Sequence, residues 1–388
     1  MTRPDGGPWD AREETIRQFE ERRPTLTFRE EAVPEYELPP VLTRPMTAEE
    51  WPGRRGEIVT LLKDHVFGVF PDGSTSRVIV GEAKAADDLG AIYRPLEVVT
   101  SRGEREHRFT AHFFAPADAD GPRPVFLLID NRRSVDDTPQ EGPESAGFWP
   151  VRDIVSRGYA TVAFRNHDVD PDTDDGFRNG VHALFEDRRE GERDAWSTIA
   201  AWAWGASRVL DALQQTPEAD GSWVAVVGHS RGGKTALCAG AYDRRFAMAV
   251  SNESGCGGAA LSRRRFGETL AVINASFPHW FNARFKTYSG NESAMPVDSH
   301  LLLAAMAPRR VYVASAAEDL WADPRGEYEA LRQAGAAFEL FGDGRLPKEM
   351  PAVDTPAATT LRGYHIRTGR HNLTAVDWSA FLDFADRR

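Results

Sequence analysis

The pentapeptide Gly228-His229-Ser230-Arg231-Gly232 is the segment of this chain whose residue types most directly suggest chemistry. An apolar run, WVAVV, precedes it, and a run typical of a helix, KTALCAGAYD, follows it. A serine flanked in this way at a strand-to-helix turn takes a strained backbone conformation that lifts its hydroxyl above the sheet. The glycines permit that turn because they carry no Cβ. The pattern predicts that Ser230 is a nucleophile for acyl transfer.

A serine hydroxyl needs a general base. In folds that carry the serine on such a strand-to-helix turn, the histidine follows the serine and the acid in sequence. Two histidines, His365 and His371, lie downstream of the last predicted core strand. His371 precedes a C-terminal helix that Thr374 opens, which is where such folds present the base. His365 lies in an alternating YHIR run typical of a strand. We therefore expect His371 to be the base and His365 to be structural.

Two carboxylates compete for the role of orienting that base. Glu253 ends the strand after the one that leads to Ser230, and Asp319 ends the next strand. The carboxyl ends of parallel strands are where α/β sheets place their chemistry. The commoner arrangement takes the acid from the later strand, which favours Asp319, but each residue also fits a capping or loop role. The choice between them stays open at this point.

Two sets of strands must position these residues. Short β-branched runs suggest antiparallel strands near one edge of a sheet, at 77–84, 96–101 and 107–116. Near-continuous apolar runs fit parallel strands buried on both faces, at 125–130, 159–165, 223–230, 246–254 and 311–319. Helical segments alternate with these runs, at 192–216, 234–243 and 326–334. We expect an α/β-hydrolase fold, a three-layer αβα sandwich with a mostly parallel central sheet.

The N-terminal part of the chain differs in composition from the rest. Residues 1–50 are charged and rich in proline, which indicates an extended arm packed on the domain. Residues 51–388 show no repeat and no Gly/Ser linker, so we expect a single catalytic domain there. At the junction, Thr47 followed three residues later by Glu50 is typical of a helix N-terminus.

Composition excludes several functions. The chain has 47 basic and 59 acidic residues, a net charge of −12, which argues against nucleic acid and against an anionic membrane surface as partners. No stretch approaches the roughly 18 apolar residues of a membrane span. Without a visible signal segment the sequence as written reads as cytoplasmic, and as secreted if a signal peptide has been removed. The oligomeric state is left open.

Neither a metal nor a cofactor is expected from the motifs. No CxxC or HExxH pattern occurs, and the acidic loop at 167–177 lacks the spacing of an EF-hand calcium site. That loop is instead expected to be solvated and capped. Cys238 and Cys256 read as buried packing residues with no disulfide between them.

Longer motifs resemble the bacterial glucuronoyl esterases of carbohydrate esterase family 15. GHSRGGKTAL is similar to that family's GxSRxGKxA elbow, and ESGCGGAALSRRRFGETL to its ESGxGG segment. PVDSHLLLAAMAPRRVYVASAAEDLWADPRGEY and GYHIRTGRHNLTAVDW are also close to the family pattern. The resemblance extends over most of residues 40–388.

The resemblance implies a role for each matching position. Ser230 would be the nucleophile and His371 the base, with Glu253 the family's acid and Asp319 a second acid found in many bacterial members. The side chain of Arg231 would help to hold the oxyanion and add a permanent positive charge. The positions that contact the glucuronate sugar match Lys234, Glu268 and Trp321.

These positions imply hydrolysis of a (4-O-methyl-)glucuronate ester, carried by a small molecule or an oligosaccharide. Since His371 must be neutral to act as a base, activity is expected to fall below about pH 6.5. The loop at 130–149 departs from the family pattern and motivates an alternative, an esterase for acetylated sugars or another small ester. A non-catalytic sugar-binding protein on the same fold is a third reading.

Overall fold

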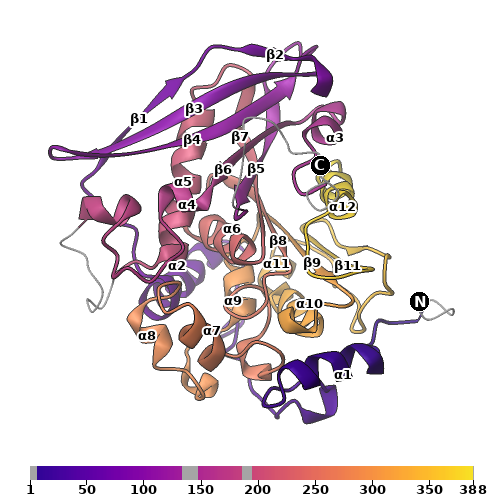
Figure 1. Cartoon of the computed structure of the whole chain (residues 1–388). Helices are drawn as coiled ribbons and strands as arrows, with labels where there is room; N and C mark the ends of the chain where they lie inside the picture. The colour runs from indigo at the N-terminus through magenta and orange to yellow at the C-terminus, as the bar shows by residue number, and fades with distance from the viewer. Residues whose placement is uncertain (1–6, 133–146, 186–194, 388) are drawn as a thin grey trace.

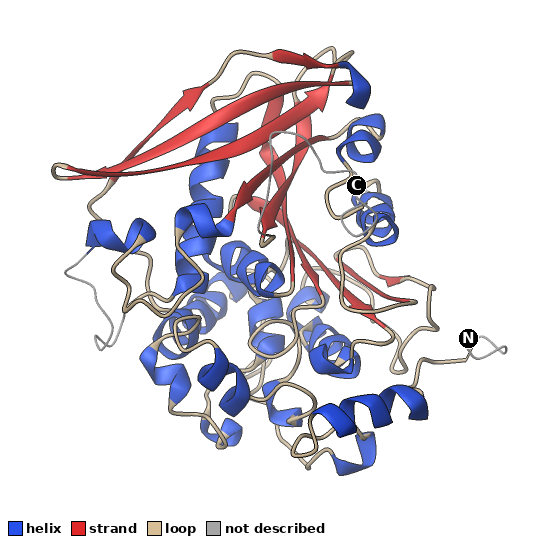
Figure 2. Cartoon of the chain, viewed as in Figure 1, coloured by secondary structure: helices blue, strands red, loops and turns tan. Residues whose placement is uncertain are grey.

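The computed structural model describes residues 7–132, 147–185 and 195–387. In this part of the chain an 11-stranded sheet forms the centre of the molecule, with helices on both of its faces (Figures 1 and 2). The strand order is β1-β3-β4-β6-β5-β7-β8-β9-β11-β10, and β2 pairs with β3 beside this path. The predicted three-layer arrangement is therefore confirmed.

The strands are β1 Thr75–Val80, β2 Lys84–Ala86, β3 Ala91–Arg102, β4 Arg105–Pro116, β5 Arg123–Asp130, β6 Ala160–Arg165, β7 Ala219–His229, β8 Phe246–Asn252, β9 Arg310–Ala316, β10 Ala357–Ala358 and β11 Arg362–Arg367. The α-helices are α1 Glu13–Arg22, α2 Trp51–Leu62, α3 Val151–Ser156, α4 Asn166–Val169, α5 Thr198–Leu213, α6 Arg231–Tyr242, α7 Leu270–Ser276, α8 Ala283–Lys286, α9 Ser299–Ala304, α10 Pro324–Gln333, α11 Gly335–Glu339 and α12 Ala375–Ala385.

The sheet changes character along its width, as the sequence predicts. Strands β1, β3, β4 and β6 pair antiparallel with one another. From β6 onward the pairs β6–β5, β5–β7, β7–β8, β8–β9 and β9–β11 are parallel. The parallel half is the part that collects the carboxyl ends of several strands at one edge, and the catalytic candidates follow those ends.

The two faces of the sheet carry separate hydrophobic cores. In β5, Val125 and Leu127 join one core, which the α5 and α6 helices complete. Phe126 and Leu128, which alternate with them, join the other core together with Trp378 of α12. All four strand residues are fully buried, because successive side chains of a strand point to opposite faces and both faces are covered here.

The N-terminal segment differs from the extended arm that its composition suggests. Residues Glu13–Arg22 form helix α1, with Ile16 buried on its inner side. Phe28 and Trp9 are also buried in the larger core, so the segment packs on the rest of the structure. Its proline-rich sequence did not reveal this helix because charged residues dominate its exposed face.

The helix expected after Thr47 begins later than the motif suggests. The Glu50 carboxylate does accept a hydrogen bond from the Thr47 backbone N–H, at 2.9 Å, but α2 starts only at Trp51. Both cysteines are buried and neither forms a disulfide, as predicted. Among the described residues, no helix has the length and apolar character that crossing a bilayer requires.

The acidic loop at 167–177 is not the solvated loop that its sequence suggests. Asp170 is buried, and its carboxylate hydrogen-bonds His182 at 2.8 Å and Thr198 at 2.8 Å. The side chain of Asp172 is also buried and lies against residues from other segments. The prediction was wrong because the donors come from distant parts of the chain, which local composition does not show.

The elbow at Ser230 depends on Gly228, and this dependence can be measured. A Cβ at Gly228 would lie 1.9 Å from the Gly232 carbonyl oxygen, a backbone atom that cannot move without deforming the elbow. We expect Gly228→Ala to lower the free energy of unfolding by about 1–3 kcal/mol or more in chemical denaturation. Gly121→Ala is the control, because a Cβ there meets nothing within 4 Å. Equal stability of the two variants would contradict this account.

Candidate active site

Ser230 occupies the sharp turn between β7 and α6. Its backbone has φ 55° and ψ −122°, a conformation that residues with a Cβ rarely adopt. Hydrogen bonds fix the turn on both sides: the Ser230 N–H donates to the Asn252 carbonyl at 2.9 Å, and the Ser230 carbonyl accepts from Gly233 at 2.9 Å. The predicted strand–turn–helix elbow is therefore present, with Ser230 half-buried at the edge of the sheet.

His371 lies in the loop between β11 and α12, next to the elbow. Its ring centroid is 4.4 Å from that of His229, the residue that precedes Ser230. Its Nδ1 atom hydrogen-bonds Asp319 Oδ2 at 2.6 Å, which leaves Nε2 as the nitrogen that can accept a proton from serine. His365 instead is buried within β11, with Nε2 at 2.9 Å from Asp377, as expected of a structural residue.

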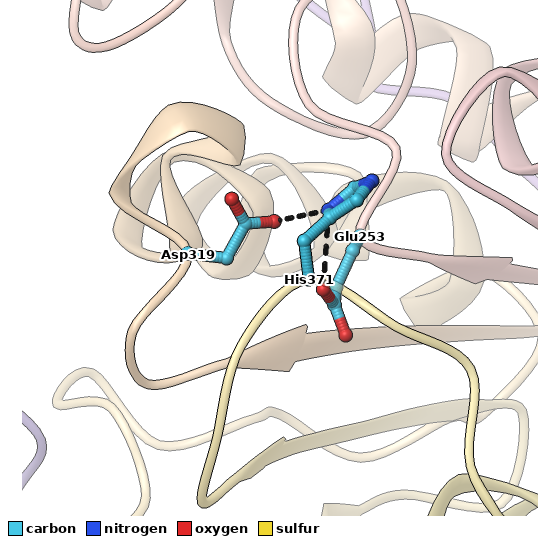
Figure 3. Close-up of side chains that lie close together, drawn as sticks. All are labelled: Glu253, Asp319 and His371. Atoms are coloured by element: carbon cyan, nitrogen blue, oxygen red, sulfur yellow. Dashed lines mark hydrogen bonds and ion pairs between the residues drawn. The ribbon is translucent and has the colours of Figure 1, made fainter. Parts of the chain in front are cut away.

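Both candidate acids approach the same nitrogen of His371. Figure 3 shows Asp319 and Glu253 reaching His371 from two directions. Nδ1 of His371 lies 2.6 Å from Asp319 Oδ2 and 3.2 Å from Glu253 Oε2. Nδ1 carries one hydrogen, so the shorter contact identifies Asp319 as its principal acceptor. The structure thus explains why the sequence leaves two candidates, since the ends of β8 and β9 converge on one imidazole.

Glu253 has further partners that Asp319 lacks. Its Oε1 accepts from Arg367 Nη2 at 2.7 Å, and its Oε2 accepts from the Asn372 backbone N–H at 3.1 Å. Arg367 also donates to the carbonyls of Arg370 and Asn372, on either side of His371. Glu253 and Arg367 together hold the loop that carries the base. Sequence reasoning missed Arg367, because it stands at the end of a strand with nothing in its type or spacing to mark it.

The pKa values of Glu253 and His371 both lie well above those of the free side chains. Burial raises the pKa of Glu253 to about 8, in spite of its hydrogen bond to His371 and the charge of Arg367. Burial by itself would lower the pKa of His371, but the charge of Asp319 and the hydrogen bonds to both acids outweigh it and raise that pKa to about 10. The His371 side chain is 40% exposed, so water screens part of this attraction. The cluster therefore favours the protonated imidazole.

Arg231 begins helix α6 directly after the nucleophile. Its guanidinium forms an ion pair with Asp172 and lies 4.8 Å from the ring centroid of Trp280. Its side chain is 29% exposed, so it stands at the boundary between the protein and solvent beside Ser230. Sequence reasoning did not identify Asp172 and Trp280 as site residues. Asp172 lies in the acidic loop at 167–177, which was considered only as a calcium site.

The three residues assigned to sugar contact by resemblance lie together. Lys234 is buried one turn along α6 from Ser230, and its Nζ donates to the Ser254 carbonyl and lies 3.9 Å from Glu268 Oε2. The Glu268 backbone N–H donates to the Trp321 carbonyl at 3.2 Å, which makes the two residues neighbours. Burial lowers the pKa of Lys234 and raises that of Glu268. Trp321 is half-buried, and the Arg23 guanidinium of the N-terminal segment lies 5.0 Å from its ring centroid.

The loop at 130–149, which departs from the family pattern, falls mostly outside the described residues. Its described start includes Arg132, whose guanidinium donates to Asn372 Oδ1 at 2.5 Å and lies 4.0 Å from the ring centroid of Phe148. Arg132 therefore contacts the residue that follows His371. This contact joins the end of β5 to the base loop and was not predicted.

Glu253, Asp319 and His371 also carry groups that could ligate a metal ion. One ligand atom each of Glu253, Asp319 and His371 lies within 4.8 Å of the others. Because Nδ1 of His371 faces both carboxylates, a proton on that nitrogen satisfies the arrangement without a cation. The expectation that the reaction needs no metal stays a prediction.

Comparison with known proteins places this chain in a family. The family model described as "Glucuronyl esterase, fungi" matches residues 98–342, well over half of the chain. A carbohydrate esterase from an unknown prokaryotic organism is 39% identical over 93% of this chain and 91% of its own length. The chain belongs to the glucuronoyl esterase family. A 4-O-methyl-glucuronoyl methylesterase of the fungus Schizophyllum commune is 30% identical over 76% of this chain and 70% of its own length.

Solved structures of this family confirm the fold. A glucuronoyl esterase from Solibacter usitatus has a TM-score of 0.84 at 35% identity, covering 92% of this chain and 99% of its own. A promiscuous esterase of carbohydrate esterase family 15 from a marine bacterial metagenome has a TM-score of 0.84 at 36% identity, covering 93% and 99%. The chain is thus an α/β-hydrolase and a carboxylic ester hydrolase, as predicted, and the non-catalytic reading is set aside.

The raised pKa of His371 changes the expected pH dependence. Because the base must be neutral, kcat/KM should fall below a pKa that lies above 6.5, whereas the ordinary pKa of histidine suggested a fall below about 6.5. Asp319→Asn removes the anion that raises this pKa, so the acid limb should move to lower pH while turnover falls about 10²- to 10⁴-fold. The measurement is a pH–rate profile with Glu318→Gln, its neighbour in sequence, as control. An acid limb unmoved by Asp319→Asn would contradict the assignment.

Glu253 should behave differently from Asp319 when its charge is removed. We expect Glu253→Gln to lower the free energy of unfolding by about 1–3 kcal/mol, because one amide oxygen cannot replace both carboxylate oxygens as acceptors for Arg367 and the Asn372 backbone N–H. Turnover should fall less than in Asp319→Asn, because the shorter contact to His371 remains. Denaturant unfolding and kcat measured on both variants check this. A larger loss of kcat in Glu253→Gln than in Asp319→Asn would reverse the two roles.

Proposed function

We propose that the chain hydrolyses esters of glucuronic acid and 4-O-methyl-glucuronic acid, with Ser230 as nucleophile, His371 as base and Asp319 as the acid that orients it. The observation that carries the proposal is the arrangement of Lys234, Glu268 and Trp321 beside the elbow. These side chains offer a cationic donor, a carboxylate acceptor and an aromatic face, which are the groups that bind sugar hydroxyls and sugar rings. The similarity to the Schizophyllum commune methylesterase supports the acid sugar.

The mechanism follows from the positions of these groups. The Ser230 oxygen attacks the ester carbonyl carbon, and its proton passes to Nε2 of His371. The negative charge on the carbonyl oxygen is held by the Arg231 N–H at the start of α6 and by the Arg231 guanidinium. When the tetrahedral intermediate collapses, the C–O bond to the alcohol breaks and the alcohol takes the proton from His371. The glucuronoyl group is then bonded to Ser230.

Deacylation repeats these steps with water. His371 accepts a proton from the water as its oxygen attacks the acyl carbon, and it returns a proton to Ser230 as the acid is released. Asp319 and Glu253 stabilise the imidazolium that forms in both halves of the reaction. Their shared contact with Nδ1 also holds the ring in one orientation and leaves Nε2 as the nitrogen that exchanges protons in this mechanism.

A second candidate function is an esterase for acetylated sugars or another small ester on the same machinery. The described similarity to a promiscuous family 15 esterase motivates it, together with the departure of the 130–149 loop from the family pattern. In that case Ser230, His371 and Asp319 keep their roles. The sugar-contact residues would then contribute little to turnover.

The test compares two esters. Methyl glucuronate and an acetyl ester are offered to the wild type, Ser230→Ala and Glu268→Gln, and hydrolysis is followed by titration of released acid. We expect Ser230→Ala to lose turnover of both esters, because each needs the nucleophile. Glu268→Gln should lower kcat/KM for methyl glucuronate about tenfold or more, because one charged acceptor for sugar hydroxyls is lost, and leave the acetyl ester nearly unchanged. Turnover of the acetyl ester alone would favour the second function.

A further inference from the structure

The guanidinium of Arg231 is held by a buried carboxylate from a distant segment. Asp172 lies in the loop after α4, and its Oδ2 atom accepts a hydrogen bond from Arg231 Nη1. The other oxygen of Asp172 accepts from His279 Nε2 at 2.8 Å and from Trp280 Nε1 at 2.7 Å. Only 4% of the Asp172 side chain is exposed. His279 and Trp280 therefore hold one oxygen of this carboxylate, and the other oxygen binds Arg231.

The charge of this carboxylate is secured by its surroundings. Burial would raise the pKa of Asp172, but hydrogen bonds from His279 and Trp280 and the charge of Arg231 outweigh burial and lower that pKa to about 2. Asp172 thus stays ionised over the whole range in which an esterase with a histidine base works. A buried anion of this kind needs its cation, and Arg231 is the cation that the structure supplies.

Aromatic rings hold the guanidinium from a further direction. Its central carbon lies 4.8 Å from the Trp280 ring centroid and 5.4 Å from that of Phe277. These two rings stack on each other, with centroids 3.8 Å apart and planes 5° apart. Trp280 therefore contacts both members of the ion pair, since its N–H binds Asp172 and its ring contacts Arg231.

One donor of the guanidinium remains unused. The Nε atom of Arg231 is buried and has no hydrogen-bond partner among the described residues. A buried N–H without an acceptor is costly unless a ligand satisfies it. On the residue next to the nucleophile, such a donor suits the carbonyl oxygen of a bound ester.

We propose that Asp172 is a positioning residue for Arg231, holding the guanidinium against Trp280 so that its unused Nε–H can serve the oxyanion. This inference rests on the role of Arg231 in the proposed function. It also changes the physical picture of that role: Asp172 cancels the net charge of Arg231 in the resting enzyme. Arg231 then acts through oriented hydrogen bonds rather than through the permanent charge expected from the sequence.

The test is a double-mutant cycle of Asp172→Asn and Arg231→Gln. Asp172→Asn keeps the shape of the side chain and an acceptor for Trp280 but removes the charge that holds Arg231. We expect kcat to fall about 10- to 100-fold, less than the 10²- to 10³-fold typical for loss of an oxyanion donor, with KM changing less than threefold. In the Arg231→Gln background the same change should have almost no effect, because its target is gone.

Two further variants separate positioning from folding. Asp174→Asn alters an exposed acid of the same loop and should leave kcat unchanged. Trp280→Phe removes the N–H that fixes Asp172 but keeps an aromatic ring, and should lower kcat by a smaller factor than Asp172→Asn. If Asp172→Asn does not fold, the cycle of Trp280→Phe with Arg231→Gln takes its place.

Three outcomes would overturn the proposal. They are an unchanged or increased kcat in Asp172→Asn, effects of Asp172→Asn and Arg231→Gln that multiply in the double variant, and a loss confined to KM. The cycle is run with whichever ester the wild type cleaves, methyl glucuronate or the acetyl ester. If the glucuronate function is wrong, the wild type will not cleave methyl glucuronate. If this inference is wrong, only the kcat values of the double-mutant cycle will show it.

Discussion

The need to neutralise buried carboxylates governs this active site. Glu253, Asp319 and Asp377 are all buried where β8, β9 and the start of α12 come together. Buried anions are tolerated only when cations or hydrogen-bond donors meet them. Arg367 supplies the permanent cation, at 2.7 Å from Glu253 and 2.9 Å from Asp377. The imidazole of His371 meets the remaining carboxylate, so its catalytic position follows from the same requirement.

The same rule operates on the other side of the nucleophile. Asp172 is buried and paired with Arg231, and Lys234 is buried near Glu268. Ser230 therefore lies between groups of paired charges that fix the flanking side chains before an ester arrives. Preorganised donors and acceptors of this kind cost no rearrangement at the moment of reaction, which is the main source of catalytic power in such sites. The strained turn at Ser230 then needs only to present its hydroxyl.

Much of the fold and part of the site could be predicted from local sequence. The parallel strands appear as apolar runs because both sheet faces are covered, and the elbow appears in the glycines that its turn requires. Ser230 and His371 follow from chain order. Arg367 and Asp172 were missed, since their importance comes from contacts with residues more than 50 positions away in sequence. The choice between Glu253 and Asp319 was undecidable because both reach one nitrogen atom.

The most direct test of whether Asp319 or Glu253 orients His371 observes the proton on His371 Nδ1 itself, by its low-field ¹H NMR resonance. A strong hydrogen bond to a carboxylate shifts such a proton far downfield. We predict that the resonance is present in the wild type and in Glu253→Gln and is lost or moved upfield in Asp319→Asn. A resonance that survives in Asp319→Asn but disappears in Glu253→Gln would contradict the account and make Glu253 the carboxylate that orients His371.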